Sequence, residues 1–166
     1  MKVAIVFYSF SGNTKRMCVF LKNKFEDRKN TVELIEVKPV KEIISFFGQC
    51  RQAFSKKEPE IGNADIDLKK YDLSIFASPV WAFTFAPALR SYLKKIGDLE
   101  NKKTACFLTC GSGAGSNKAL SELENILREK HTHILFSKNL AGRKSKNKNF
   151  LEDNFNTLFE IINNDE

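Results

Sequence analysis

Short, unbroken runs of apolar residues recur along this chain, and they constrain its fold more than any other feature. Four runs cover residues 3–8, 73–77, 105–109 and 134–136, and a half-alternating run covers residues 32–37. Strands that read as continuous apolar runs are typical of parallel sheets, because helices cover both faces of such a sheet. The pattern therefore predicts five buried strands.

Helical periodicity fills the segments between these runs. Apolar residues recur three and four positions apart in five segments, which cover residues 14–25, 41–54, 85–96, 117–129 and 150–162. Strands that alternate with helices predict an α/β fold, with a doubly wound, five-stranded parallel sheet and helices on both faces. The chain has 166 residues and no internal repeat, so we expect residues 1–166 to form a single domain.

Cysteine usage and hydropathy exclude a disulfide scaffold and a membrane protein. Four cysteines occur, and no two have C-x-x-C spacing: Cys18, Cys50, Cys106 and Cys110. This usage is typical of a reducing compartment. The longest uncharged stretch, residues 73–89, is interrupted by two prolines and is too short for a spanning helix. With no signal-peptide pattern at the start, we expect a soluble, cytoplasmic protein without a membrane partner.

Basic residues outnumber acidic ones by 27 to 20, which gives a formal net charge of +7. Such a surface favours anionic partners, among them acidic proteins and phosphorylated ligands. No nucleic-acid-binding motif accompanies the charge, so we do not expect a nucleic-acid partner. A non-enzymatic module that binds anions or nucleic acid is the outlying alternative.

A polar loop follows the first predicted strand and leads directly into a helix. We call it the phosphate loop, and it consists of Ser9, Phe10, Ser11, Gly12, Asn13 and Thr14. Backbone N–H groups at a helix N-terminus attract phosphate, hydroxyls donate to it, and Gly12 allows the chain to approach closely. The loop contains no lysine or arginine, so neutral donors would hold the anion. A loop that only caps the helix is the alternative interpretation.

The phosphate loop resembles that of the flavodoxin family. The family pattern has two aliphatic residues, an aromatic residue, Ser or Thr, a small residue and a final Thr, and residues 5–14 match it in order. Cys18 stands where alanine is usual in the family. The resemblance implies a sheet with strand order 2-1-3-4-5 and FMN as cofactor. It also implies that Ser9, Ser11, Asn13 and Thr14 hold the 5′-phosphate of FMN.

A second candidate loop follows the third predicted strand. Ligands of doubly wound sheets bind outside the carboxyl ends of the strands, and this loop contains Ser78, Pro79, Val80, Trp81, Ala82 and Phe83. It resembles the second flavin loop of the family, which places an aromatic residue against the isoalloxazine ring. Trp81 suits stacking on a planar ring, and a core tryptophan is the alternative. We expect Phe83 and Phe85 to pack in the core, with a place in the wall of the site as the alternative.

A glycine-rich segment follows the fourth predicted strand. We call residues 110–115 the glycine loop, and its candidate site residues are Cys110, Gly111, Ser112, Gly113 and Gly115. Glycines allow close backbone approach and offer N–H donors to the flavin carbonyls. Related electron carriers often have a tyrosine here, and none occurs between residues 107 and 136. The resemblance therefore implies an open outer flavin face, as in flavodoxin-like quinone reductases.

Single residues in these regions have plain structural interpretations. Cys110 fits a space-filling role better than that of a redox thiol. His131 and His133 are predicted to share one strand face, without the cysteine or carboxylate spacing of a zinc site.

The segment 38–60 includes a predicted helix that packs on the sheet, with a dimer contact or a lid over the site as the alternative. The basic run 143–148 is either a solvated loop or a docking patch for an acidic redox partner or the extra phosphate of NADPH.

Two functions fit the flavin prediction. We favour a flavodoxin-like redox protein that transfers electrons through bound FMN to a partner protein. The alternative is an NAD(P)H-dependent FMN oxidoreductase that passes electrons to a quinone or another small acceptor. The net charge of +7 departs from the acidic surface of typical flavodoxins and points toward the enzyme. No side chain is a clear general acid or base, so the flavin itself would supply the chemistry.

Overall fold

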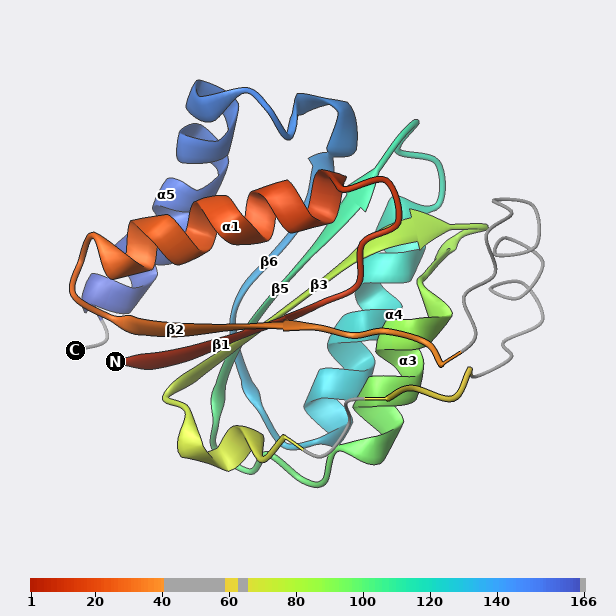
Figure 1. Cartoon of the computed structure of the whole chain (residues 1–166), viewed down its shortest axis with the longest axis horizontal. Helices are drawn as coiled ribbons and strands as arrows, with labels where there is room; N and C mark the ends of the chain where they lie inside the picture. The colour runs from red at the N-terminus through yellow and green to blue at the C-terminus, as the bar shows by residue number, and fades with distance from the viewer. Residues whose placement is uncertain (41–58, 63–65, 165–166) are drawn as a thin grey trace.

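A computed structural model describes residues 1–40, 59–62 and 66–164 of the chain. Five parallel strands form the central sheet in the order β2-β1-β3-β5-β6 (Figure 1). The strands are β1 (Lys2–Phe7), β2 (Thr31–Glu36), β3 (Leu73–Trp81), β5 (Lys103–Cys110) and β6 (His133–Ala141). Because the short β4 (Thr84–Phe85) also takes a number, this order is the predicted 2-1-3-4-5. The predicted fold is confirmed.

Helices cover both faces of the sheet (Figure 1). Helices α1 (Asn13–Glu26) and α5 (Lys148–Asn164) cover one face, and α3 (Pro87–Lys95) and α4 (Ser116–Glu129) cover the other. Two short 3-10 helices, η1 (Leu68–Lys70) and η2 (Gly142–Lys144), precede β3 and α5. The predicted helix over residues 41–54, and with it most of the segment 38–60, lies outside the described residues.

The buried strands divide their side chains between two apolar cores. In β1, Val3, Ile5 and Phe7 point into the core under α1 and α5, while Ala4 and Val6 point into the core under α3 and α4. Side chains alternate across a strand, so a strand buried on both faces needs apolar residues at every position. Full burial of such a side chain contributes about 1.5–3 kcal/mol, which explains why the unbroken runs predict these strands.

Helices α1 and α5 pack against each other as well as against the sheet. The ring centroids of Phe25 in α1 and Phe159 in α5 lie 4.9 Å apart. Phe155 in α5 also meets Phe107 of β5 edge to face, with a centroid distance of 5.2 Å. These contacts hold α1 and α5 together on the same face of the sheet.

The third strand is longer than the sequence predicts, and the second candidate loop is a hairpin. Strand β3 continues through Trp81, turns at Ala82 and Phe83, and pairs antiparallel with β4. Phe85 is therefore a strand residue, and α3 begins two residues later than predicted, at Pro87. Proline is favoured at the first position of a helix because its fixed φ suits the helix and its missing N–H costs nothing there. We call residues 78–85 the β3–β4 hairpin.

Two further observations bear on the predictions. His131 adopts a left-handed backbone (φ 55°) in the turn before β6, so it does not share a strand face with His133 as predicted. Its ring instead pairs with Asp98 at 2.8 Å. No helix among the described residues has the length and apolar character that crossing a membrane requires.

Candidate functional site

Three segments meet at the edge of the sheet where the parallel strands end (Figure 1). They are the phosphate loop, the β3–β4 hairpin and the glycine loop, from which the sequence predicts the site. A cavity of 250 Å³ lies between the hairpin and the glycine loop. It is lined by Val80, Ala82, Phe83, Cys110, Gly111, Ser112, Gly113 and Ala114. All but Ala114 belong to the predicted set.

The phosphate loop leaves backbone donors open at the start of α1. Gly12 precedes the helix with φ of +82°, a left-handed conformation that favours glycine. Ser9 Oγ accepts a hydrogen bond from the backbone N–H of Lys15 at 3.2 Å. No acceptor among the described residues bonds the N–H groups of Asn13 and Thr14. These two groups, with the hydroxyls of the loop, form a set of neutral donors suited to an anion.

Contacts from distant parts of the chain fix this loop. Thr14 Oγ1 and Thr109 Oγ1, both buried, share a hydrogen bond of 2.8 Å that ties the start of α1 to the end of β5. Asn13 Oδ1 accepts from Ser145 Oγ at 3.0 Å and from Arg16 Nη1 at 2.9 Å. Sequence reasoning missed Ser145, because 132 residues separate it from Asn13 and no local pattern links them. The hydroxyl of Thr14 therefore also acts as an anchor.

The turn of the β3–β4 hairpin is strained. Both Ala82 (φ 45°) and Phe83 (φ 66°) adopt left-handed conformations, which tight two-residue hairpins require and which glycine or asparagine usually supply. The prediction that Phe83 packs in the core is wrong, since 57% of its surface is exposed. It rests instead on the glycine loop, where a Cβ added to Gly115 would lie 2.1 Å from Phe83 Cδ1. The turn thus holds an exposed aromatic ring at the mouth of the cavity.

The other predicted residues of the hairpin lie in strands and point away from the cavity. Trp81 is 7% exposed and meets Tyr8 and Phe10 edge to face, with centroid distances of 5.4 and 6.0 Å. It therefore links the hairpin to the phosphate loop. Ser78 is buried and its Oγ accepts from the N–H of Ala86 at 2.9 Å. Pro79 pairs with β5, and Phe85 is buried, as predicted.

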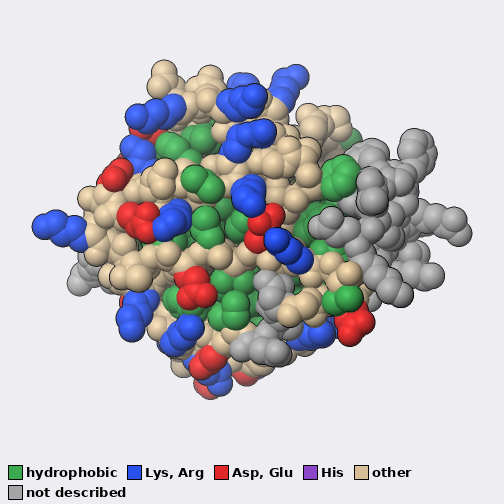
Figure 2. All heavy atoms as spheres, in the orientation of Figure 1, with side chains coloured by type: hydrophobic (Ala, Val, Ile, Leu, Met, Phe, Trp, Pro, Cys, Tyr) green, Lys and Arg blue, Asp and Glu red, His purple; other side chains and the backbone are tan. Residues whose placement is uncertain are grey.

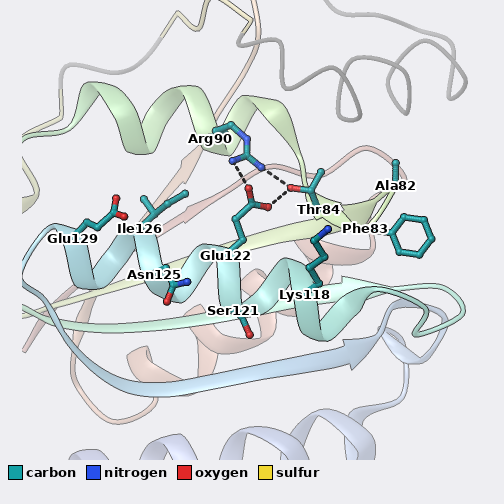
Figure 3. A pocket seen from close by; sticks show the side chains of 10 residues that line it. All are labelled: Ala82, Phe83, Thr84, Arg90, Lys118, Ser121, Glu122, Asn125, Ile126 and Glu129. Atoms are coloured by element: carbon teal, nitrogen blue, oxygen red, sulfur yellow. Dashed lines mark hydrogen bonds and ion pairs between the residues drawn. The ribbon is translucent and has the colours of Figure 1, made fainter.

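A partly buried charged triangle links the hairpin to helices α3 and α4 (Figure 3). Arg90 of α3 donates from Nη1 to Glu122 Oε1 of α4 at 2.8 Å and from Nη2 to Thr84 Oγ1 at 2.5 Å. Thr84 in turn donates to Glu122 Oε2 at 2.5 Å. The guanidinium also stacks 4.5 Å from the ring centroid of Phe85. One sequence signal existed: Arg90 lies on the apolar stripe of its helix, four residues after Ala86 and three before Leu93.

A larger cavity of 760 Å³ lies beside this triangle, between α4 and the hairpin (Figure 3). Figure 3 shows Arg90, Glu122 and Thr84 joined to one another at its wall, while Phe83 lies at its end. The central charges of this cavity are thus engaged with each other. We therefore assign the triangle to support of the hairpin.

The described cysteines differ in accessibility. Burial raises the pKa of the Cys106 thiol to about 12, and burial together with Glu36 raises the pKa of the Cys18 thiol well above its usual range. Both are therefore uncharged thiols that fill space. Cys110 is half-buried, lines the 250 Å³ cavity and donates to the carbonyl oxygen of Leu140 at 3.5 Å. Among the described residues, no cluster of three metal-ligating side chains occurs.

A doubly wound sheet with a loop of neutral donors after β1 and a cavity between the ends of β3 and β5 is a flavodoxin-like architecture, in which ligands bind at the carboxyl ends of the strands. The chain belongs to the NADPH-dependent FMN reductase family, whose model matches residues 1–146. The prediction of a flavodoxin-like, FMN-binding redox protein is confirmed at the level of this family. No curated protein matches the sequence.

Solved structures agree with this assignment. A flavoprotein in complex with FMN from Lactobacillus acidophilus is 25% identical, with a TM-score of 0.69 over 83% of this chain and 92% of that chain. Flavodoxin 2 from Bacillus cereus is 18% identical, with a TM-score of 0.68 over 99% of both chains. A flavodoxin from Streptococcus pneumoniae is 14% identical, with a TM-score of 0.67 and the same coverage. The two flavodoxins show the fold alone.

The residues present suit FMN. The open N–H groups of Asn13 and Thr14 and the neutral hydroxyls of the phosphate loop match a phosphate monoester. The cavity beside them has an aromatic wall at Phe83 and a backbone-rich wall in the glycine loop, as a planar ring with carbonyl groups requires. The donor set and the cavity lie at the same edge of the sheet.

Proposed function

We propose that this chain is an FMN-dependent oxidoreductase that takes electrons from a nicotinamide nucleotide and passes them to a small acceptor. The observation that carries the proposal is the lining of the 250 Å³ cavity: apart from Phe83, only small side chains and Val80 line it. No side chain larger than cysteine occurs in the glycine loop. This loop therefore leaves the outer side of the cavity open to a second planar ligand.

The phosphate loop would hold the 5′-phosphate of FMN. Ser11 is exposed at the loop tip and would donate its hydroxyl. The backbone N–H groups of Asn13 and Thr14 would donate along the axis of α1, where the helix dipole favours an anion. The anchors Thr109 and Ser145 would keep these donors aligned before the ligand arrives.

The hairpin and the glycine loop would hold the flavin ring. The ring of Phe83 and the side chain of Val80 supply apolar surface on one wall. Backbone N–H groups of the glycine loop are available on the opposite wall for the ring carbonyls. Trp81 braces the hairpin against the phosphate loop through Tyr8 and Phe10.

The chain itself contributes binding, orientation and exclusion of water. FMN, when bound, supplies the capacity to accept a hydride and to release the electrons onward. Of the residues that line the 250 Å³ cavity, only Cys110 carries a titratable group. The residues of this cavity would therefore act by positioning and by the polarity of their backbone groups.

An electron carrier is the second candidate function. The chain shares its fold with two solved flavodoxins over 99% of its length. In that case the net charge of +7 would suit an acidic partner protein. The two functions differ in one property: only the oxidoreductase reacts directly with a nicotinamide nucleotide.

A visible spectrum and an anaerobic titration test the proposal. Purified protein is mixed with FMN, freed of excess flavin, and titrated with NADPH and with NADH. Rapid bleaching of the flavin bands by a nucleotide supports the oxidoreductase. If dithionite bleaches the flavin bands but neither nucleotide does, the oxidoreductase proposal is overturned in favour of the carrier. Failure to retain FMN overturns both functions.

Two readouts locate the flavin. Trp81 is the only tryptophan, and FMN bound at the predicted loops should quench its fluorescence. In a Cys50→Ser background, FMN should also slow the reaction of Cys110 with a thiol reagent, because that side chain lines the cavity. The buried Cys106 serves as the unreactive internal control. FMN that binds without either effect lies elsewhere.

A further inference from the structure

A second groove lies on the other side of the phosphate loop, between the start of α1 and the start of α5. Its volume is 620 Å³, and we call it the α1–α5 groove. Apolar side chains from both helices form its floor, namely Val19, Phe20 and Leu151. Basic side chains form its rim, among them Arg16, Lys146 and Lys148. Figure 2 shows Lys and Arg side chains gathered along the upper edge of this face, with apolar side chains below them.

The basic rim is placed against the preference of the two helices. The positive ends of both helix dipoles point to this corner, where acidic residues stabilise a helix and basic ones destabilise it. Neither α1 nor α5 has an acidic residue in its first turn. Lys15 and Arg16 occupy that turn in α1, and Lys148 begins α5. Residues that break a local stability rule are expected at functional sites.

Two of the cations at the rim face no described carboxylate. Lys15 pairs with Glu36 at 2.7 Å, and Lys24 pairs with Glu152 at 2.8 Å. Arg16 and Lys146 form no ion pair with any described residue, and Arg16 is held only by the neutral amide of Asn13. Lys148 lies close to Glu152, and the hydrogen bond from Lys24 together with the charge of Lys148 lowers the pKa of that carboxyl. The groove thus combines two helix N-termini with two cations, Arg16 and Lys146, that no described carboxylate compensates.

Hydrogen bonds through Asn13 pin the two walls of the groove together. Asn13 Oδ1 accepts from Arg16 on α1 and from Ser145, which lies between the two basic residues Lys144 and Lys146. The side chain of Asn147 caps α5 by accepting from the N–H of Phe150 at 3.0 Å. The basic run is therefore ordered beside the phosphate loop, and Gly12 borders both the loop and the groove.

We propose that the α1–α5 groove binds the phosphorylated adenosine end of NADPH, with Arg16, Lys146 and Lys148 facing the 2′-phosphate. This inference rests on the proposed function, because it names the residues that would let the oxidoreductase select NADPH over NADH. Arginine and lysine supply charge-assisted hydrogen bonds to a phosphate, and the apolar floor suits a purine. A volume of 620 Å³ is that of a small-molecule pocket, which favours a nucleotide over a protein partner.

Calorimetry with 2′,5′-ADP and ADP on the FMN-loaded protein tests the inference. The two probes differ in the position of one phosphate group, and bound FMN blocks the phosphate loop. We expect 2′,5′-ADP to bind at least tenfold more tightly than ADP. In the double variant Lys146→Gln, Lys148→Gln this preference should be lost, and the KM for NADPH should rise at least tenfold relative to the KM for NADH. FMN affinity, measured in the same samples, reports separately on the proposed function.

A matched variant removes the same charge elsewhere. Lys69 and Lys95 are exposed and lie near the opposite edge of the sheet, so Lys69→Gln, Lys95→Gln should retain the preference for 2′,5′-ADP. Equal losses in the two double variants would show a general charge effect and overturn the inference. Binding of 2′,5′-ADP to the apoprotein alone would place it in the phosphate loop and also overturn it. A groove that binds an acidic protein but neither probe would be a docking face instead.

Discussion

The phosphate loop and the β3–β4 hairpin flank the same site, yet they are built in opposite ways. The phosphate loop takes its left-handed turn at Gly12, where the backbone is free to adopt it. The hairpin takes two left-handed residues at Ala82 and Phe83, where each side chain resists that conformation. Neutral hydrogen bonds hold the first segment, and a partly buried charged triangle holds the second.

The difference indicates where each segment obtains its shape. A relaxed loop needs only alignment, and single hydrogen bonds such as that between Thr14 and Thr109 provide it. A strained turn needs surroundings that over-determine it. Here Arg90 and Glu122 bond Thr84 of the hairpin, and the ring of Phe83 packs against Gly115 of the glycine loop. Strain kept at the mouth of a cavity is consistent with a turn that positions an aromatic ring for a ligand.

The charged triangle should produce the largest effect. Arg90→Met keeps the aliphatic stem but removes the guanidinium bonds to Thr84 and to Glu122, whose side chain is 26% exposed. Loss of one member of a buried pair costs about 3 kcal/mol, and we expect a fall of about that size in the free energy of unfolding. Urea denaturation measures it.

The control for this variant is a more exposed pair on α4, the helix that carries Glu122. Arg128 and Glu124 form an ion pair at 3.3 Å, and the side chain of Arg128 is 60% exposed. Arg128→Met should lower the free energy of unfolding by only about 0.5 kcal/mol, as for other surface pairs. Equal costs in the two variants would mean that the triangle does not support the hairpin.

The phosphate loop should respond through ligand affinity rather than stability. Ser11→Ala removes an exposed hydroxyl that, unlike Ser9, bonds no described backbone group. A hydrogen bond to a charged group is worth about 2 kcal/mol, so FMN affinity should fall roughly thirtyfold, measured by fluorescence titration. Riboflavin lacks the phosphate and serves as the control ligand. An equal loss of riboflavin affinity would contradict the assignment of Ser11 to the phosphate.

The same contrast explains what the sequence could predict. The phosphate loop is local: a buried strand, a run of hydroxyls with one glycine, and a helix follow one another within residues 2–26. The five strands are equally readable, because burial on both faces leaves unbroken apolar runs. The resemblance to flavodoxins rests on these local features, and the family match supports it.

The hairpin could not be predicted in this way. Its turn lacks the Asn-Gly or Asp-Gly pair that signals a tight hairpin, so residues after Ala77 read as a loop. Its support comes from two other elements, since Arg90 of α3 and Glu122 of α4 both bond Thr84 of the hairpin. The exposure of Phe83 follows from this tertiary support, and an aromatic residue between Ala82 and Thr84 gives no local sign of it.

The contact between Phe83 and the glycine loop gives a smaller effect. In Gly115→Ala the new Cβ would lie 2.1 Å from Phe83 Cδ1, at a residue whose φ is +71°. Gly113→Ala is the matched control, because its φ is +80° and nothing lies within 4 Å of the added Cβ. Both variants share the backbone strain, so the overlap alone should cost Gly115→Ala about 1–2 kcal/mol more in unfolding free energy.

Removing the ring tests the origin of that excess. In a Phe83→Ala background the overlap is absent, and Gly115→Ala should cost no more than Gly113→Ala. The double-mutant cycle isolates the contact between the two segments. An excess that persists without the ring would mean that Phe83 does not rest on Gly115 in solution.

The smallest effect concerns the strain of the turn itself, and its sign is the informative part. A non-glycine residue in the left-handed region costs about 1–2 kcal/mol, whereas glycine adds about 0.5–1 kcal/mol of unfolded-state entropy. Ala82→Gly should therefore stabilise the protein by about 0.5 kcal/mol, despite the loss of a methyl group. Ala114→Gly, at an exposed position without positive φ, should destabilise it by a similar amount. Thermal denaturation measures the change in stability of both variants. Changes of opposite sign would locate the strain in the hairpin, whereas a destabilised Ala82→Gly variant would show that the turn is relaxed. Because that turn carries Phe83, a stabilised variant that also binds FMN more weakly would indicate that the strain serves the ring's position.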